Sequence, residues 1–413
     1  AVSLGLRMVS EHTLSRVFAR LRPNPRVFVS GNFATPLQLL GVLDSVVPSY
    51  TIHALNAQPG LPSREGVSYE TCFVGPGMRG FDRLSYVPAR LSMVGTLLRT
   101  TLRPDVALVS VSAPRNGMVS LGIETNVVPS AIEATRSAGG LVIAAVNPHM
   151  PYTFGDSELD VSLFDYAFAV DEPLVSPSGP ARSSDVFSSI GANVASLIPD
   201  GATLQLGIGA IPDATLQHLK VGRLGVFTEM FSDGVMNLDF AGQLDPDREL
   251  VASFAFGSPE FYAWLDGNRR VRMLRTETTN DPARIASHPL MYSVNAALQV
   301  DLYAQANASW TGTRVFSGFG GSTDFIVGAM HSPAGAAVMA LPSWHDKSDS
   351  STIVPRLSTP ATSFQHSFLV TDHGVAAVAG APLCVQARRI VDRCADPRAR
   401  DWLSEQAHQL GLM

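Results

Sequence analysis

Short runs of aliphatic residues alternate along this chain with segments of helical periodicity, and this alternation limits the fold more than any other feature. Arg26–Val29, residues 106–109 and Leu141–Val146 are apolar runs of strand length, and residues 129–138 have the composition of a crossover helix. Strands covered on both faces are nearly continuously apolar, as in parallel sheets flanked by helices. The pattern therefore predicts an α/β fold built from two similar open domains with largely parallel sheets.

A stretch rich in serine, proline and glycine at residues 176–180 is the best candidate for a linker. Beyond it, apolar residues recur on one helical face between residues 186 and 197, and Ser184 or Asp185 is placed to cap this helix. A strand predicted at Thr203–Leu206 then begins a second series of strands and helices. The predicted domains are residues 1–182 and 183–413.

The composition excludes several classes of protein. The 413 residues carry a formal net charge of −6 without a cluster of Lys and Arg, which argues against binding to nucleic acid. Three scattered cysteines are too few for a disulfide framework or a tetrahedral metal site. The N-terminal residues lack the pattern of a secretion signal, and no apolar run approaches the roughly 20 residues needed to cross a membrane. We expect a cytoplasmic protein without a membrane or metal partner.

A glycine pair follows the strand predicted at Thr203–Leu206. Gly207, Ile208, Gly209 and Ala210 lead into a helix with a proline near its start. Glycines let a ligand approach the backbone closely, and a helix N-terminus offers free N–H groups to an anion. An ordinary tight turn between strand and helix explains the same letters, so this segment alone is a weak signal.

Glu229 follows the apolar run 224–227, so we expect it at the carboxyl end of a strand, where open parallel sheets place their ligand crevices. A carboxylate among Phe227, Met230 and Phe231 is partly desolvated, and this costs free energy unless the group is paired or used. The alternative is a carboxylate without a function at the rim of the sheet.

A second glycine-rich segment, residues 316–325, contains Gly318, Phe319, Gly320 and Gly321. Its glycines form a backbone nest that fits an oxyanion or a phosphate, and a flexible loop is the alternative. Residues 293–302 precede this segment, alternate like a single strand and lead to Asn307.

Four segments together resemble the acetyl-CoA hydrolase/transferase family of CoA-transferases, and weaker similarity extends through the first half of the chain. The segments, in chain order, are LQLGIGAIPDA, TEMFSDGV, NAALQVDLYAQANAS and FSGFGGSTDF. The joint occurrence of four segments in this order is far more specific than one glycine pair.

The resemblance implies two α/β halves with the active site in the cleft between them. It also implies that Glu229 is the catalytic nucleophile and that Asn307 and Gly321 assist in holding the thioester or its oxyanion. The backbone of Gly207, Ile208, Gly209 and Ala210 and that of Gly318, Phe319 and Gly320 would line the site of the coenzyme A thioester. This thioester is a substrate, so the reaction needs no cofactor. Its partner is a small carboxylic acid, and the family implies a homo-oligomer.

The chain departs from the family pattern at several positions. Asp372 and His373 stand where members commonly have Glu and Tyr, and Ala145 replaces a glutamate. Ser322 stands where many members have glutamine, and the segment that ends at Gln365 lacks an arginine. These departures leave Glu229 intact and concern the pockets for the acyl group and the acceptor acid.

Three functions are compatible with these residues. The first is transfer of CoA between an acyl-CoA and a free acid through an acyl-glutamyl anhydride and a glutamyl-CoA thioester. The second is hydrolysis of the thioester by the same glutamate, which differs in whether water is excluded. The third is CoA binding without catalysis, and the retention of Glu229 and both glycine loops argues against it.

Overall fold

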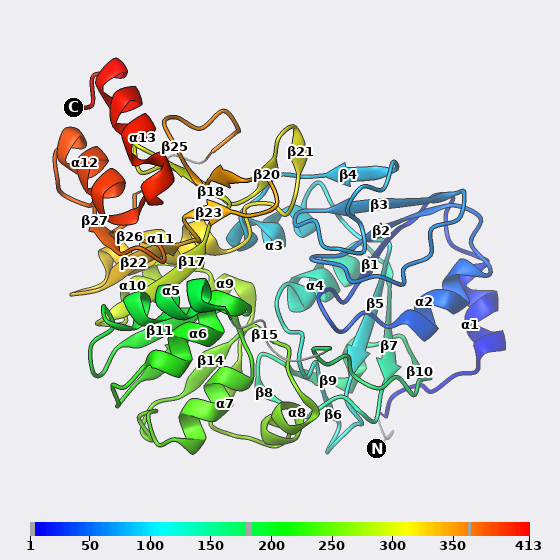
Figure 1. Cartoon of the computed structure of the whole chain (residues 1–413). Coiled ribbons are helices and arrows are strands. Elements are labelled where there is room, and N and C mark those ends of the chain that lie inside the picture. Colours follow the sequence, from blue (N-terminus) through cyan, green and yellow to red (C-terminus); the bar gives the residue numbers. More distant parts are fainter. Residues whose placement is uncertain (1–4, 179–183, 362–364) are drawn as a thin grey trace. The chain divides into compact units, whose positions relative to one another are not determined.

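The computed structural model describes residues 5–178, 184–361 and 365–413. The chain divides into two compact units (Figure 1). The first unit comprises Ala1–Pro177, Leu250–Thr279 and Phe316–Gly320, and the second comprises Ser178–Glu249, Asn280–Val315 and Gly321–Met413. The predicted boundary between residues 182 and 183 and the end of the predicted linker, residues 179–180, lie outside the described residues.

The first unit contains a seven-stranded sheet in which every neighbouring pair is parallel. The order is β10 (Tyr166–Ala169), β7 (Leu141–Val146), β5 (Val106–Val111), β1 (Arg26–Val29), β2 (Tyr50–His53), β3 (Val67–Thr71) and β4 (Leu84–Tyr86). The central strand β5 is buried along its whole length. The apolar runs at β1, β5 and β7 were predicted as strands from sequence, and the structure confirms them.

Helices pack on this sheet and complete the core of the first unit. The helices of its N-terminal segment are α1 (Glu11–Phe18), α2 (Leu37–Asp44), α3 (Leu91–Arg99) and α4 (Val128–Ser137). The predicted crossover helix at 129–138 is α4, with Val128, Ala131 and Ile132 in the main hydrophobic cluster. The later segments of the unit add β14 (Leu250–Ala252) and β16 (Val271–Met273), which pair in parallel, and β8 (Phe154–Gly155) pairs with β16.

The second unit contains six neighbouring strands that are parallel except at one edge. Its strands lie side by side in the order β12 (Gly225–Phe227), β11 (Thr203–Leu206), β17 (Met291–Ala296), β22 (Ala336–Ala340), β26 (Phe368–Val370) and β27 (Val375–Ala377). Only the last pair of this series is antiparallel. Both units therefore have the largely parallel α/β architecture that the sequence predicts.

The helices of the second unit begin with α5 (Asp185–Ala195), which starts where the sequence predicts. The Ser184 side chain accepts a hydrogen bond from the Phe187 N–H at its N-terminus. The other helices are α6 (Ala210–His218), α7 (Asp233–Phe240), α10 (Pro282–Ala286), α11 (Ser322–His331), α12 (Leu383–Cys394) and α13 (Pro397–Gln409). Among the helices of the described residues, none combines the length and apolarity that a membrane span requires.

The prediction of one strand over residues 293–302 is wrong. The segment forms two strands, because β17 ends at Ala296 and β18 (Gln299–Asp301) belongs to a separate small sheet with β19 (Ala306–Asn307) and β25 (Ile353–Val354). The Leu298 N–H donates to the carbonyl oxygen of Asn307, which draws the chain into the hairpin between β18 and β19. Alternation of apolar residues continues through this bend, so periodicity alone does not reveal it.

Candidate active site

The carboxyl ends of β11 and β12 bring together two of the predicted segments. The two strands pair in parallel, with Thr203 opposite Gly225 and Leu204 opposite Val226, so Gly207 and Glu229 both follow strands at the same edge of the sheet. The Thr228 hydroxyl lies 3.1 Å from the carbonyl oxygen of Leu206 and 3.0 Å from that of Met230. This buried hydroxyl ties the turn that carries Glu229 to the end of β11.

Glu229 contacts two further residues of the second unit, Asn280 and Gly321. A Cβ atom added at Gly321 would lie 2.8 Å from the Glu229 Oε1 atom and closer still to the Nδ2 atom of Asn280. The Asn280 side chain is fully buried beside the Glu229 carboxyl group, and its amide lowers the pKa of that group. Glu229 itself is half-buried. The carboxyl group is therefore held between an amide side chain and a glycine whose missing side chain leaves room for it.

The packing of α10 against α11 places Asn280 and Gly321 beside each other. Asn280 precedes Asp281, which caps α10 by accepting a hydrogen bond from the Ala283 N–H at 2.9 Å. Gly321 is the N-cap of α11, and a Cβ atom at Gly328 in that helix would lie 2.5 Å from the Ile285 Cβ atom of α10. The close approach of the two helices thus fixes the wall of the site opposite Glu229.

The environment of Glu229 favours its protonated form. Burial and the nearby negative charge of Asp324 raise its pKa to about 7, and the polar side chain of Asn280 opposes this rise. Desolvation and a like charge both destabilise an ionised carboxylate. A carboxyl group that gains and loses its proton near neutral pH, at the ligand edge of a parallel sheet, is typical of a catalytic group.

The first glycine loop joins β11 to α6 as predicted. Gly209 has a φ of 123°, which favours glycine, and α6 begins at Ala210. A Cβ atom at Gly207 or Gly209 would meet no atom within 4 Å, and Ile208 is exposed. The backbone N–H groups at this helix start therefore border open space, where an anionic ligand can approach them.

The second glycine loop is divided between the two units. Gly318, Phe319 and Gly320 belong to the first unit, where a Cβ atom at Gly318 would lie 2.8 Å from the Cys72 carbonyl oxygen, and the Leu91 N–H donates to the Gly320 carbonyl at 2.8 Å. Gly321 belongs to the second unit and lies against Glu229. A role of Gly318–Gly320 in binding CoA stays a prediction.

Asn307 lies buried in β19, with its side chain engaged in its own turn. Its Oδ1 atom accepts hydrogen bonds from the N–H groups of Ser309 (3.1 Å) and Trp310 (2.9 Å), and its Nδ2 atom donates to the Trp310 carbonyl at 2.7 Å. The amide therefore shapes the loop after β19 in this structure. Its predicted role in holding the thioester stays a prediction.

Sequence reasoning missed Asn280 and the role of Asp324. Asn280 lies between short helices in a run of polar residues that matches no catalytic pattern, so only the packing of α10 and α11 reveals it. Asp324 lies within a segment that the sequence marked for its glycines, and its fully buried side chain was not anticipated.

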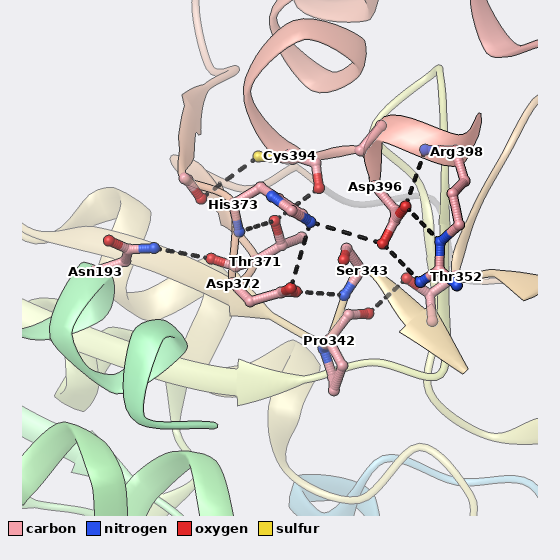
Figure 2. Close-up of polar contacts among 12 residues, drawn as sticks. Asn193, Pro342, Ser343, Thr352, Thr371, Asp372, His373, Cys394, Asp396 and Arg398 are labelled. Carbon is pink, nitrogen blue, oxygen red and sulfur yellow. Dashed lines mark hydrogen bonds and ion pairs between the residues drawn. The ribbon is translucent and has the colours of Figure 1, made fainter. Parts of the chain in front are cut away.

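Asp372 and His373, which differ from the family pattern, lie in a separate polar network of the second unit (Figure 2). Asp372 accepts a hydrogen bond from the Ser343 N–H at 2.7 Å, and the His373 Nε2 atom lies 3.5 Å from Asp372 and 3.7 Å from Asp396. The Arg398 guanidinium donates two hydrogen bonds to Asp396, at 2.9 and 3.0 Å, and its backbone N–H donates a third at 2.9 Å. The network thus ties the turn between β26 and β27 to the start of α13.

The other positions that differ from the family pattern lie in different parts of the chain. Ala145 is fully buried in β7, and Ser322 is the first residue of α11, directly after Gly321. Residues 362–364, before Gln365, lie outside the described residues.

Asp396 is expected to stabilise the C-terminal network in a pH-dependent way. Its hydrogen bonds with Arg398 lower its pKa to about 2, below the ordinary value of 3.8. The folded protein then binds fewer protons here than the unfolded chain, so the stabilisation is present above pH 4 and is lost as the pH falls from about 4 to 2. Between pH 5 and pH 3, the wild type should lose about 1 kcal/mol more free energy of unfolding than Asp396→Asn.

Urea titrations at the two pH values measure this difference. Asp401→Asn, an exposed position on α13, the helix that Asp396 caps, is the matched control and should follow the wild type. An Asp396→Asn variant whose stability falls as steeply as that of the wild type contradicts the assignment.

Comparisons with known proteins agree with this fold. The chain is 35% identical over 415 residues to "4-hydroxybutyrate coenzyme A transferase" of Clostridium kluyveri, covering 95% of each chain. It is 33% identical to "Succinyl-CoA:acetate/propanoyl-CoA:succinate CoA transferase" of Fasciola hepatica, covering 94% of this chain and 86% of the relative. Residues 257–407 match the model of the acetyl-CoA hydrolase/transferase C-terminal domain.

Solved structures show the same architecture. RipA from Yersinia pestis superposes with a TM-score of 0.90 at 25% identity, and a 4-hydroxybutyrate CoA-transferase from Porphyromonas gingivalis with a TM-score of 0.82 at 30% identity. Each comparison covers 98% of both chains. Fold and relatives together define an enzyme of the class that contains CoA-transferases and acetyl-CoA hydrolases. The chain belongs to the acetyl-CoA hydrolase/transferase family.

Proposed function

We propose that this enzyme transfers CoA from an acyl-CoA to a free carboxylic acid, with Glu229 as the covalent nucleophile. One observation supports the proposal above the others: the Glu229 carboxyl group lies at the carboxyl end of β12, against Gly321 and Asn280, with a pKa of about 7. At and above this pH an appreciable fraction of the group is ionised and available to attack. A carboxylate is a competent nucleophile toward a thioester, because the thiolate is a good leaving group.

The reaction proceeds through two covalent forms of Glu229. Its carboxylate oxygen attacks the thioester carbonyl carbon, the carbon–sulfur bond breaks, and CoA leaves as a thiolate from an acyl-glutamyl anhydride. The thiolate attacks the glutamyl carbonyl carbon, which releases the first acid as a carboxylate and leaves a glutamyl-CoA thioester. A second carboxylate attacks this thioester, and the same steps run in reverse to give the new acyl-CoA and free Glu229.

Backbone N–H groups and the Asn280 amide are the candidate donors to the oxyanions that form at each attack. One such donor typically accounts for roughly 3 kcal/mol of transition-state stabilisation. The Asn280 amide and the Glu229 carboxyl group both lie against Gly321, so Asn280 is close to the reacting carbon of both covalent forms.

Hydrolysis is the second candidate, because relatives with that activity are also present. The chain is 32% identical over 224 residues, 51% of its length, to an "Acetyl-CoA hydrolase" of Kluyveromyces lactis. Both reactions use the same glutamate and differ in whether water reaches the covalent intermediates. Ping-pong kinetics that require a second carboxylate support transfer, whereas release of CoA without an acceptor acid supports hydrolysis.

Mass spectrometry tests the covalent mechanism directly. The protein is incubated with acetyl-, butyryl- or succinyl-CoA, quenched and digested, and the peptide that contains Glu229 is expected to carry CoA in thioester linkage. Borohydride reduction should convert the same glutamate to an alcohol. Turnover of a CoA ester without either modification at Glu229 overturns the proposed mechanism.

A homo-oligomeric state and a cytoplasmic location stay predictions that rest on the resemblance and the composition. The coenzyme A thioester is proposed here as a substrate, with a small carboxylic acid as its partner.

A further inference from the structure

We propose that Asp324 is a positioning residue whose buried negative charge destabilises the free Glu229 carboxylate and thereby promotes its acylation. This inference rests on the proposed function and adds a second carboxylate to it. Asp324 itself forms no bond with the acyl group in this scheme.

The position of Asp324 follows from the helix that also carries Gly321. Gly321 is the N-cap of α11 and contacts the Glu229 carboxyl group, and Asp324 lies three residues later, in the first turn of the same helix. Only 1% of its surface is exposed. Because α11 packs tightly on α10 through Gly328, the helix start has little freedom to move the second carboxylate away from the first.

Two electrostatic interactions involve Asp324 at the start of α11. The partial positive charge of a helix N-terminus favours an ionised carboxylate in the first turn, which is where Asp324 lies in α11. The same ionised group repels the Glu229 carboxylate, in surroundings where screening by water is weak. Among the titratable groups around Glu229, Asp324 is the one whose charge raises the pKa of Glu229, in addition to burial.

Acylation removes this repulsion. Free Glu229 carries a negative charge when ionised, whereas the glutamyl anhydride and the glutamyl-CoA thioester are neutral at this side chain. The charge of Asp324 therefore destabilises the free nucleophile relative to both covalent forms. It also makes Glu229 more basic, and a more basic carboxylate is the better nucleophile once ionised. The covalent intermediates consequently form more readily than they would beside a neutral residue.

Asp324→Asn tests the inference, because it removes the charge and preserves the shape. The acid limb of kcat/KM for the acyl-CoA should lie near pH 7 in the wild type, and the variant should shift it down by about one pH unit. Above pH 8, where Glu229 is ionised in both proteins, the acylation rate of the variant should be several-fold lower. If Asp324 had only a structural role, the substitution would lower the rate but would leave the midpoint of the acid limb of the pH profile unchanged.

A titration that does not depend on turnover separates this inference from the proposed function. Carbon-13 NMR of protein labelled at the glutamate carboxyl follows Glu229 directly, and Glu229→Gln identifies its signal. Asp324→Asn should move the midpoint of this titration down, Asp324→Glu should restore it, and Asp247→Asn, an exposed carboxylate of the same unit, should leave it unchanged. Asp324→Ser serves as a second neutral variant if the asparagine variant does not fold.

An unchanged Glu229 midpoint in the neutral variants overturns the inference, even where Glu229 is essential for turnover. Full activity of Glu229→Gln is a different result and overturns the proposed function.

Discussion

Replacing Glu229 with glutamine is expected to lower kcat by about four orders of magnitude or more, for transfer and for hydrolysis alike. The amide has the shape of the carboxyl group but does not attack a thioester, so no anhydride forms. The peptide that contains residue 229 should then carry no CoA after incubation with acyl-CoA. Steady-state assays with acetyl-, butyryl- and succinyl-CoA measure the loss, and Glu249→Gln, an exposed glutamate of the same unit, is the matched control.

The same substitution should leave the fold at least as stable at pH 8. The pKa of Glu229 in the folded protein lies above the ordinary value of 4.5, so the folded protein holds a proton that the unfolded chain releases. The stability linked to that proton is fully present below pH 4.5 and is lost as the pH rises to about 7. A neutral glutamine avoids this loss. A variant that retains more than a tenth of wild-type kcat contradicts the nucleophilic role of Glu229.

Gly321→Ala is expected to lower kcat/KM by about 10²-fold without unfolding the protein. The new Cβ atom would lie 2.8 Å from the Glu229 Oε1 atom and closer to the Asn280 amide, so one of these groups must move. Displacing a reacting group by about 1 Å costs on the order of 10²-fold in rate. The φ of Gly321 is −102°, which alanine adopts readily, so backbone strain does not contribute to the loss.

Kinetics and thermal denaturation together test this prediction. Gly222→Ala is the control in the same unit, because its Cβ atom would make only an ordinary contact, 3.7 Å from the Asp200 Oδ1 atom. The control should keep its activity, and both variants should melt within a few degrees of the wild type. Wild-type rates for Gly321→Ala would show that the contact with Glu229 has no part in the reaction.

The sequence predicted best those features that depend on neighbours along the chain. The strands β1, β7 and β11 coincide with the segments predicted as strands, because a strand buried on both faces is rich in aliphatic residues. The start of α5 was predicted from Ser184, because capping depends on a side chain within three residues of the helix start. Gly207 and Glu229 were placed correctly at strand ends, because β11 and β12 follow each other in the chain and pair in parallel.

Only the tertiary structure decided which groups surround Glu229. Asn280, Gly321 and Asp324 lie 51 to 95 residues beyond Glu229 in the chain, and the packing of α10 on α11 brings them to its carboxyl group. The bend between β17 and β18 was not predicted either, because the alternation of apolar residues continues through it. The bend leads into the β18–β19 hairpin, where the Leu298 N–H donates to the Asn307 carbonyl oxygen. Apolar runs and caps are encoded locally, whereas desolvation and repulsion act through space. The sequence alone therefore determined the α/β fold and proposed the nucleophile, and the tertiary structure decided which neighbours set the charge state of that nucleophile.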